Sequence, residues 1–387
     1  MVPKLRFKEF CGELTKDKFK NLIKLQRGSS PRPINKYITT KEDGVNWIKI
    51  GDISKEDNII KKTKEKITRE GAKKSRYVQK GDLILSNSMS FGRPYLLAID
   101  GYIHDGWFVL KEYEKNLNKN YLCQLLSSDA VKNQYKKIAA GGVVSNISSD
   151  LVNSVEVNIP SLPEQTKIAN FLSTVDDKIQ NQQDKITHLE NIKKGFMQRI
   201  FSRKIRFKDD GGDEFPEWEE KKLGDIADIK KGTQLSKSEI SDNGKYYHLN
   251  GGINPSNYTD KFNVEKNTIS ISEGGNSCGY INWNKERFFS GGHNYTIQNL
   301  INIIDKYYLY QYLKYNQKKI MRLRVGTGLP NIQQKDLNIF IVKFPCLKEQ
   351  QKIADFLSLF DEKISTEKEI LEHLKKLKKG LLQQMFV

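Results

Sequence analysis

The segment EQTKIANFL, from Glu164 to Leu172, decides the architecture because it returns as EQQKIADFL from Glu349 to Leu357. The match continues downstream through paired aspartates, lysines and glycines as far as Phe201 and Phe386. A segment that recurs in this way marks an internal duplication, which fixes how many structural units the chain holds. The sequence therefore predicts two copies of one unit, each a divergent domain followed by a preserved helix.

Both preserved segments carry apolar residues at alternating spacings of three and four, the pattern of a coiled-coil seam. Polar residues occupy the fifth and eighth seam positions: Gln182 and Lys193 in the first copy, Glu367 and Lys378 in the second. A polar residue at such a position helps to fix the register of a coiled coil. We expect the two helices to pack on each other; the alternative is two surface helices docked on separate domains.

The duplication extends into the domains, where LRFK at 5–8 parallels IRFK at 205–208. Alternating apolar residues predict two pairs of equivalent strands, Trp47–Ile53 with Tyr247–Ile253 and Gly81–Ser86 with Asn267–Ser272. Between these segments the two domains are hardly alike. We infer that scaffold strands have been kept while the loops have diverged.

Composition favours a polyanionic partner and excludes several classes of protein. The 387 residues include 65 Lys+Arg against 47 Asp+Glu, a formal charge of +18. Four widely separated cysteines without a C-x-x-C motif predict reduced thiols rather than disulfides or a zinc site. The charged start of the chain and the lack of a long apolar run predict a cytoplasmic protein with no membrane span.

No catalytic constellation is recognisable in the sequence. Gly326–Gly328 lacks the lysine of a phosphate-binding loop, and Asn254–Asn257 lacks the second proline and the aromatic residue of an amino-methyltransferase motif. Glu220–Lys222 lacks the upstream Pro-Asp of a nuclease core, and the histidines have no metal-ligand spacing. We therefore predict neither a catalytic residue nor a metal site.

Basic, amide and aromatic residues accumulate instead in the variable segments. Arg reads guanine edges, Asn reads adenine, and Tyr, Ser and Lys anchor phosphates, so these types suit major-groove recognition. The candidate DNA-binding residues of the first domain are Arg27, Arg32, Lys36, Asn46, Trp47, Lys49, Asn87, Ser88, Arg93, Tyr95, His104 and Trp107. Those of the second domain are Tyr246, Tyr247, His248, Asn250, Glu273, Asn276, Tyr280, Asn282, Trp283, Arg287, His293, Asn294 and Tyr295.

A variable domain that ends in P-x-L-x-E-Q-x-x-I-A-x-F-L, followed by a heptad helix and then repeated, resembles the specificity (S) subunit of type I restriction–modification systems. Ile159–Leu172 carries the motif in the first copy and Phe344–Leu357 in the second, where Lys348 replaces Pro163. The resemblance covers essentially the whole chain. It implies a bacterial or archaeal protein that serves in defence against foreign DNA.

The resemblance implies an α+β architecture with an internal pseudo-two-fold repeat. Two mixed α/β target-recognition domains would be separated by an antiparallel two-helix coiled coil. We expect the first domain at 1–160 with its helix at 161–203, and the second domain at 204–344 with its helix at 345–387. The S subunit would perform no chemistry, and its two unlike domains would read an asymmetric, bipartite site on double-stranded DNA.

The resemblance also implies partners that carry the cofactors. Two methylase (M) subunits would bring S-adenosylmethionine for methylation of adenine N6, and restriction (R) subunits, two of them, would bring ATP and Mg²⁺ for translocation and cleavage. Repeated residues on the outer helix faces are the expected docking sites: His188, Lys193, Lys194, His373, Lys378 and Lys379. Two alternatives are a free-standing DNA-binding regulator without methylase partners and a coiled-coil interaction protein whose charge only confers solubility.

Overall fold

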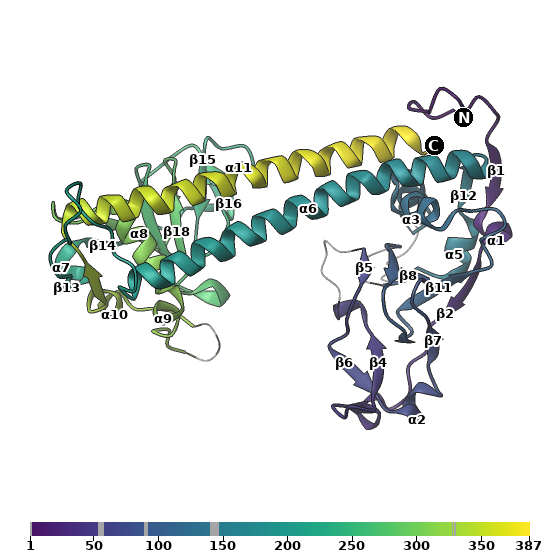
Figure 1. Ribbon diagram of the computed structural model, residues 1–387, viewed down its shortest axis with the longest axis horizontal. Helices are drawn as coiled ribbons and strands as arrows, with labels where there is room; N and C mark the ends of the chain where they lie inside the picture. The colour runs from purple at the N-terminus through teal and green to yellow at the C-terminus, as the bar shows by residue number, and fades with distance from the viewer. Residues whose placement is uncertain (1, 53–57, 89–91, 140–146, 327, 329) are drawn as a thin grey trace. The chain divides into compact units, whose positions relative to one another are not determined.

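The computed structural model describes residues 2–52, 58–88, 92–139, 147–326, 328 and 330–387 (Figure 1). The chain forms two compact units. Unit 1 comprises residues 1–183 together with 369–387, and unit 2 comprises residues 184–368. Each unit therefore contains one divergent domain and parts of both long helices. No helix in the described part of the chain combines the length and apolar character that crossing a membrane requires.

Unit 1 contains three β-sheets, with strand orders β1-β12, β3-β6-β4-β10-β7 and β2-β11-β8-β9-β5. Most neighbours are antiparallel, but β4 with β10 and β5 with β9 are parallel. The strands are β1 Thr15–Lys18, β2 Lys24–Arg27, β3 Ile38–Thr39, β4 Val45–Ile48, β5 Ile59–Ile60, β6 Glu65–Ile67, β7 Arg76–Val78, β8 Leu83–Ser86, β9 Pro94–Leu97, β10 Gly101–Ile103, β11 Trp107–Lys111 and β12 Glu156–Ile159.

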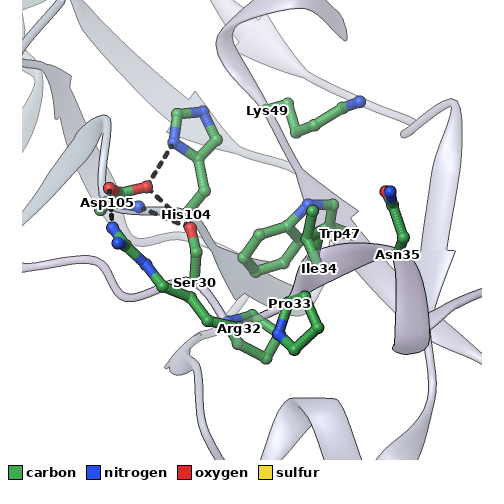
Figure 2. A pocket seen from close by; sticks show the side chains of 10 residues that line it. Ser30, Arg32, Pro33, Ile34, Asn35, Trp47, Lys49, His104 and Asp105 are labelled. Atoms are coloured by element: carbon green, nitrogen blue, oxygen red, sulfur yellow. Dashed lines mark hydrogen bonds and ion pairs between the residues drawn. The ribbon is translucent and has the colours of Figure 1, made fainter.

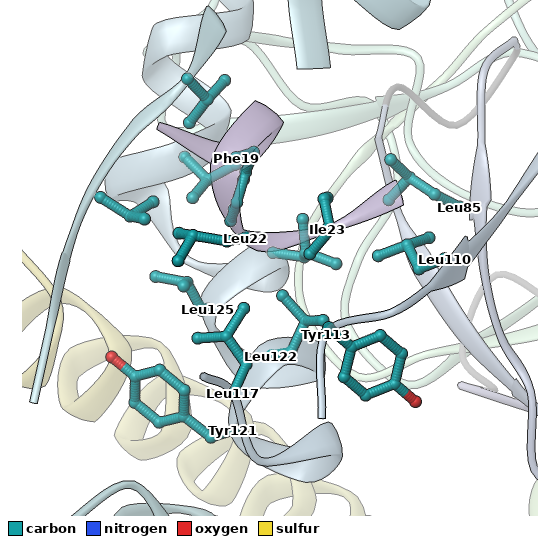
Figure 3. Packing of buried hydrophobic residues seen from close by; sticks show 14 of the residues in the cluster. Phe19, Leu22, Ile23, Leu85, Leu110, Tyr113, Leu117, Tyr121, Leu122 and Leu125 are labelled. Carbon is teal, nitrogen blue, oxygen red and sulfur yellow. The ribbon is translucent and has the colours of Figure 1, made fainter. Parts of the chain in front are cut away.

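Short helices complete unit 1 and close its main core. They are α1 Phe19–Leu22, η1 Ile34–Lys36, η2 Ile50–Asp52, α2 Arg69–Ala72, α3 Lys119–Ser127, α4 Asp129–Ala139 and α5 Ser149–Ser154. Figure 3 shows how Phe19, Leu85 and Leu122 pack into one apolar cluster, with Tyr121 beside α11. The ring of Phe386, near the end of α11, lies 5.4 Å from that of Tyr121. The end of the second long helix is thus part of the core of unit 1.

Unit 2 contains sheets ordered β13-β21, β14-β20-β17-β18 and β16-β15-β19. Its strands are β13 Glu219–Lys222, β14 Asp228–Lys231, β15 Tyr246–Leu249, β16 Asn257–Thr259, β17 Thr268–Ser272, β18 Ile281–Asn284, β19 Phe289–Ser290, β20 Asn294–Gln298 and β21 Ile341–Phe344. Its short helices are α7 Leu223–Ile226, η3 Lys237–Glu239, η4 Gly275–Ser277, α8 Lys306–Tyr315, α9 Gln317–Met321 and α10 Gln334–Asn338.

The two units share one framework. The order β2-β11-β8-β9 in unit 1 matches β14-β20-β17-β18 in unit 2, and β1-β12 matches β13-β21. Unit 1 adds β5 at the edge of one sheet and β3 and β7 at the edges of another. The internal repeat and the α+β class expected from the sequence are confirmed.

The predicted strands formed, but none fills its whole predicted segment, and two end well before its last residue. The segment Trp47–Ile53 continues from β4 into the turn of η2, while Ile53 itself lies outside the described residues. Its counterpart ends at Leu249, because Gly251 has a φ of 80°, a left-handed conformation that breaks an extended strand. In both domains the chain thus leaves the sheet and enters a loop early.

The long helices are α6 Leu162–Phe201 and α11 Leu347–Met385, which pair in antiparallel fashion within each unit. In unit 2, Lys185 and Lys193 of α6 bond to Glu367 and Asp361 of α11, so the numbering rises along one helix as it falls along the other. In unit 1, Lys378 bonds to Asp176 at 2.5 Å. The alternative of two helices docked on separate domains is wrong.

The duplicated Glu-Gln motif ties each long helix to its domain. Arg6 donates two hydrogen bonds to Glu164, at 2.7 and 2.8 Å, and Arg206 donates to both oxygens of Glu349 in the same way. A bidentate pair of this kind fixes geometry as well as charge. The preserved R-F-K and E-Q segments are therefore two halves of one contact.

The glutamine of the motif connects the start of the long helix to the start of a shorter one. Gln165 accepts a hydrogen bond from the amide of Asn118 and donates to the carbonyl oxygens of Asn116 and Pro160. The side chain of Asn118 in turn caps α3. In unit 2, Gln350 makes the equivalent bonds around Asp305, the cap of α8.

Candidate nucleic-acid interface

Loops from two sheets meet in each unit. In unit 1 they follow β2, β4 and β8 and precede β11, and in unit 2 the loops that follow β15 and β17 and precede β20 meet. In unit 2, the hydroxyls of Ser272 and Ser277 donate to the carbonyl oxygen of Gly251, which joins the loops after β15 and β17. Variable side chains are thereby gathered on a preserved framework, the usual setting of a binding site.

In unit 1 these loops enclose a cavity of about 850 Å³. Figure 2 shows the side chains that line it, with Trp47 between the group around Asp105 and the side chains of Lys49 and Asn35. The Arg32 side chain is 85% exposed. The hollow therefore offers an exposed cationic donor, Arg32, above a partly apolar floor.

Asp105 is the hydrogen-bonding centre of this hollow. Its carboxylate accepts a 2.7 Å hydrogen bond from Ser30 and lies 3.8 Å from the guanidinium of Arg32. The hydrogen bond from the Ser30 hydroxyl lowers the pKa of Asp105 below its ordinary value; burial opposes this shift, while a backbone hydrogen bond and the charges of His104 and Arg27 add to it. The side chain is thus an ionised acceptor at neutral pH, the chemistry that the exocyclic amine of cytosine requires.

The opposite side of the hollow is held by pairing and packing. Lys49 forms a 2.5 Å ion pair with Glu65 on β6. The indole of Trp47 is 1% exposed and packs against Ile67 and Ala72. Trp47 therefore forms the floor of the hollow rather than a platform on which a base could stack.

The corresponding cluster in unit 2 is built around Glu273. Its carboxylate accepts from Lys231 at 2.5 Å and from the Tyr295 hydroxyl at 3.1 Å, and it lies 3.4 Å from Nδ1 of His293. Burial, and then the charge of Glu273, raise the pKa of Tyr295 to about 12, so the hydroxyl keeps its proton and donates. The amide of His293 donates to the Asn250 side chain, which adds a third loop to the cluster.

Strand pairing shows that the two clusters use equivalent positions with different chemistry. Arg27 pairs with Phe108 as Lys231 pairs with Tyr295, and Ser86 pairs with Trp107 as Ser272 pairs with Asn294. The next residues therefore correspond, so that Asn87 occupies the place of Glu273 and Gly106 that of His293. A neutral amide and a glycine in one unit thus replace a carboxylate and an imidazole in the other.

The structure brings only some of the predicted DNA-binding residues together. In unit 1, Arg32, Trp47, Lys49 and His104 line one hollow, and Asn87 supports it by donating to the carbonyl oxygen of Asp105. In unit 2, Asn250, Glu273, His293 and Tyr295 form one cluster. Neighbouring exposed positions are Arg27, which donates to the same Asp105 oxygen, Lys36 on η1 and Asn276 on η4.

Other predicted residues lie away from these clusters. Asn46 bonds to the carbonyl oxygen of Asp100, and Arg93 lies in a second hollow beside α11. Tyr246 packs against Phe262, over which Arg287 also lies, while Tyr280 lies over Lys314. Ser88 is partly buried in the loop after β8, and Tyr247, Asn282 and Trp283 are partly buried on β15 and β18.

Several candidates are side chains of the core, which corrects the sequence-based list. Amide and aromatic groups were chosen by chemical type, but type does not report burial, and in this structure these groups satisfy internal packing or hydrogen bonds. Besides Trp47, the buried candidates are Asn87, Tyr95, Trp107, His248, Glu273, Asn294 and Tyr295. His248, for example, shares a 2.7 Å hydrogen bond with Asn257.

Two of the expected partner-docking residues are also misplaced. Lys193 is 8% exposed and pairs with Asp361, while Lys378 pairs with Asp176, so both lie between the helices. Both lysines occupy seam positions of the heptad pattern, and these positions correctly indicated that the side chains face the other helix. His188, Lys194, His373 and Lys379 are exposed on the helices as expected.

Sequence reasoning missed Ser30, Asn35 and Asp105, which line the hollow of unit 1. Acidic and small polar residues were not sought at that position, although Asp105 directly follows the candidate His104. Lys231 was missed as well. The internal repeat could have revealed it, because the flanking residues Ile229 and Gly232 already align with Leu25 and Gly28 around Arg27.

Comparisons with known proteins agree with the duplicated framework. The family model for the type I restriction modification DNA specificity domain matches residues 16–191 and again 216–376. A putative type I specificity subunit from Mycoplasma genitalium is 38% identical over 171 residues, which cover 44% of this chain and 44% of that protein. A putative type I restriction enzyme specificity subunit from Methanocaldococcus jannaschii is 28% identical over 374 residues, covering 90% of this chain and 85% of that one.

The first of these relatives is therefore matched over less than half of its length. Among solved structures, the crystal structure of a type I restriction-modification S subunit from M. genitalium aligns over 100% of this chain and 99% of its own, with a TM-score of 0.64 at 22% identity. At that identity the likeness concerns the fold.

Among the described residues, no group of three or more His, Cys, Asp or Glu side chains could hold a metal ion.

Proposed function

Because this chain belongs to the family of type I restriction modification DNA specificity domains, we propose that it is the DNA-binding specificity subunit of a type I restriction–modification complex. Residues 1–160 and 204–344 would each read one half of an asymmetric, bipartite site on double-stranded DNA. Residues 161–203 and 345–387 would form the paired helices that hold the partner subunits. The subunit itself would be non-catalytic.

One observation carries this proposal: a single framework, present twice, offers different chemistry at equivalent loop positions. Arg27 and Gly106 in unit 1 correspond to Lys231 and His293 in unit 2, whose side chains are exposed. The buried side chains of Asn87 and Glu273 support these positions from equivalent places. Two identical readers would recognise two copies of one sequence. Two readers with unlike donors and acceptors recognise two different half-sites, because base edges differ in their pattern of donors and acceptors.

In the hollow of unit 1, Arg32 and Asp105 are the side chains suited to direct reading of bases. Arg32 is exposed and can donate two parallel hydrogen bonds to a guanine edge. Asp105 is held ionised by Ser30 and can accept from a cytosine amine. The overall charge of +18 would supply the phosphate attraction that is independent of sequence.

The partners expected for such a subunit are two M subunits and two R subunits. S-adenosylmethionine would be bound by the former, and ATP with Mg²⁺ by the latter, in the cytoplasm of the cell. The exposed residues His188 and Lys194 on α6, and His373 and Lys379 on α11, are the proposed docking positions. Their repetition in the two helices favours two equivalent partner subunits.

Substituting Arg32 with Ala tests the proposal at a single residue. If Arg32 reads a guanine, Arg32→Ala weakens binding to the native site by about 1–3 kcal/mol and relaxes one position of one half-site. Sequencing methylated adenines in cells that carry the chain and its partners gives the readout. Arg69→Ala is the matched control, because Arg69 is an exposed arginine of the same domain on α2, outside the hollow.

A uniform loss of affinity across all sequences would contradict the base-reading role of Arg32 and make it a phosphate contact. If the wild-type chain directs no sequence-specific methylation with any set of partners, the proposed function is wrong.

A further inference from the structure

Unit 1 has a second hollow, of about 450 Å³. It is distinct from the hollow lined by Arg32 and Asp105, which we call the base-reading hollow. Five cationic side chains from three separate parts of the sequence line it: Arg93, Lys132, Lys375, Lys378 and Lys379. Unlike charges scattered over a surface, these groups converge on one concave space. Convergent cations with low-dielectric walls concentrate positive potential.

Neighbouring carboxylates compensate only part of this charge. Lys378 pairs with Asp176 and Lys375 with Glu372, while Asp129 on the wall accepts from Gln383. Lys132 and Lys379 form no salt bridge with any residue that the structure describes. Burial lowers the pKa of Lys132, Asp129 opposes this effect, and the positive charges of Arg93 and Lys378 add to it. An anion placed in the hollow would relieve that repulsion.

One further wall group is a donor that suits a phosphate group. Asn58 accepts from Arg93 through its carbonyl oxygen at 2.9 Å, which leaves its amide hydrogens for a ligand. The first turn of the eleven-residue helix α4 also borders the space through Asp129 and Lys132. A helix N-terminus favours negative charge. The Asp129 carboxylate is the one lining group that opposes an anion.

Unit 2 differs at the equivalent place. The amide of Ser86 donates to the carbonyl oxygen of Arg93, as that of Ser272 donates to Tyr280, so Arg93 and Tyr280 occupy equivalent positions. Ser127 likewise corresponds to Lys314, since α3 and α8 share the Y-L-x-Q segment. In unit 2, Lys314 lies 3.9 Å from the centre of the Tyr280 ring. An aromatic–cation pair thus stands where unit 1 has an arginine and a serine.

This asymmetry decides between two classes of partner. Two identical protein subunits docked on the repeated helices would meet the same groups at both sites, namely Lys379 in one repeat and Lys194 in the other. Of the cations around this hollow, Lys378 and Lys379 recur as Lys193 and Lys194, whereas Arg93 and Lys375 are replaced in unit 2 by Tyr280 and Glu190. A ligand that contacts the two units differently fits the observation better, and DNA that carries two unlike half-sites is such a ligand.

We propose that the hollow lined by Arg93, Lys132 and Lys379 binds a phosphate group, supplied by the backbone of the bound DNA. This inference rests on the proposed function, because it assumes that the chain binds DNA. It adds a sequence-independent anchor beside the paired helices, separate from the base-reading hollow. Phosphate contacts position a protein on the duplex without carrying sequence information directly.

The test measures the affinity of the full-length chain for a short duplex of random sequence, by fluorescence anisotropy over a range of salt concentrations. Lys132→Gln and Lys379→Gln should each weaken binding about tenfold at ~0.1 M salt and reduce the salt slope by about 1. Lys376→Gln is the matched control, since Lys376 is an exposed lysine of the same helix that does not line the hollow. Its affinity should stay within about twofold of the wild type.

Equal weakening by Lys379→Gln and Lys376→Gln, or wild-type binding by both hollow variants, would overturn the inference while leaving the proposed function intact. Inorganic phosphate serves as a second probe. If it binds in a Lys132-dependent manner while duplex affinity is unchanged, the hollow takes a soluble phosphate and not DNA. Loss of association with methylase subunits at unchanged duplex affinity would assign it to a protein partner. A wild-type chain that binds no duplex would overturn the proposed function itself.

Discussion

At the scale of single residues, the strongest constraints lie where the two repeats are most alike. Glu349 is fully buried and depends on Arg206 for compensation, as Glu164 depends on Arg6. A buried carboxylate that loses its partner is costly, because desolvation is then not repaid. These residues therefore preserve the framework, and the proposed reading of DNA is assigned to residues that differ between the repeats.

Lys314 illustrates how a single buried charge affects stability. It donates to the carbonyl oxygen of Ile281 at 2.8 Å and to Gln317 at 3.0 Å, with Lys193 and Asp361 nearby. Burial first, and then the charge of Lys193, lower its pKa to about 8 from 10.5, although Asp361 opposes the shift. Above pH 8 the folded chain has lost a proton that the unfolded chain still binds.

This shift predicts a pH dependence of known sign. Between about pH 8 and 10.5, the unfolded chain keeps the Lys314 proton that the folded chain has released. A state that binds more protons is favoured at low pH, so raising the pH through this range disfavours the unfolded chain. The free energy of unfolding of the wild type therefore rises over this range. In Lys314→Met, this increase of stability with pH is absent. The stability of the wild type minus that of the variant should increase by about 2 kcal/mol between pH ~7 and ~10. Urea unfolding at several pH values measures it, and parallel profiles would refute the prediction.

At the scale of elements, hydrophobic periodicity was a reliable guide and residue type was not. The heptad seam, the helices and the paired strands follow from local patterns, and all of them formed. The seam position of Lys193 was visible too, but its partner Asp361 lies in the other repeat, and no local pattern connects them. For the same reason the hollow around Asp105 could be predicted only in part. Arg32 and Lys49 were identified by residue type, whereas Asp105 and Ser30 are important because of the residues that they contact.

The cross-helix pair of α6 and α11 yields a prediction for the paired helices. Asp361 accepts from Lys193 at 2.6 Å and also from Tyr307 and Gln311. Lys193→Met leaves a partly buried carboxylate with neutral donors only, so unfolding should become easier by about 1–3 kcal/mol. Adding Asp361→Asn removes the stranded charge and should restore more than half of that loss.

The free energy of unfolding of the single and double variants is measured by urea unfolding. Lys194→Met is the control, since the adjacent side chain is exposed, and it should change stability by no more than about 0.5 kcal/mol. If Lys193→Met and the double variant are equally destabilised, the loss comes from packing and the ion pair is not its cause.

At the scale of the whole molecule, the chain is a duplicated frame that carries two unlike sets of loops. The Arg-Glu-Gln contact recurs in both units, and so does the order of the central strands. The hollow of unit 1 and the Glu273 cluster of unit 2 occupy equivalent ends of that frame but differ in charge and hydrogen bonding. The central claim is therefore that each unit reads its own half-site independently of the other.

Exchange of one domain tests this claim most directly. Residues 205–344 are replaced by the corresponding segment of another specificity subunit, and methylated adenines are sequenced in cells that also carry the partner subunits. Our account predicts a methylated site in which one half changes to that of the donor and the other half stays as in the wild type. A site in which both halves change together, or neither does, would contradict it.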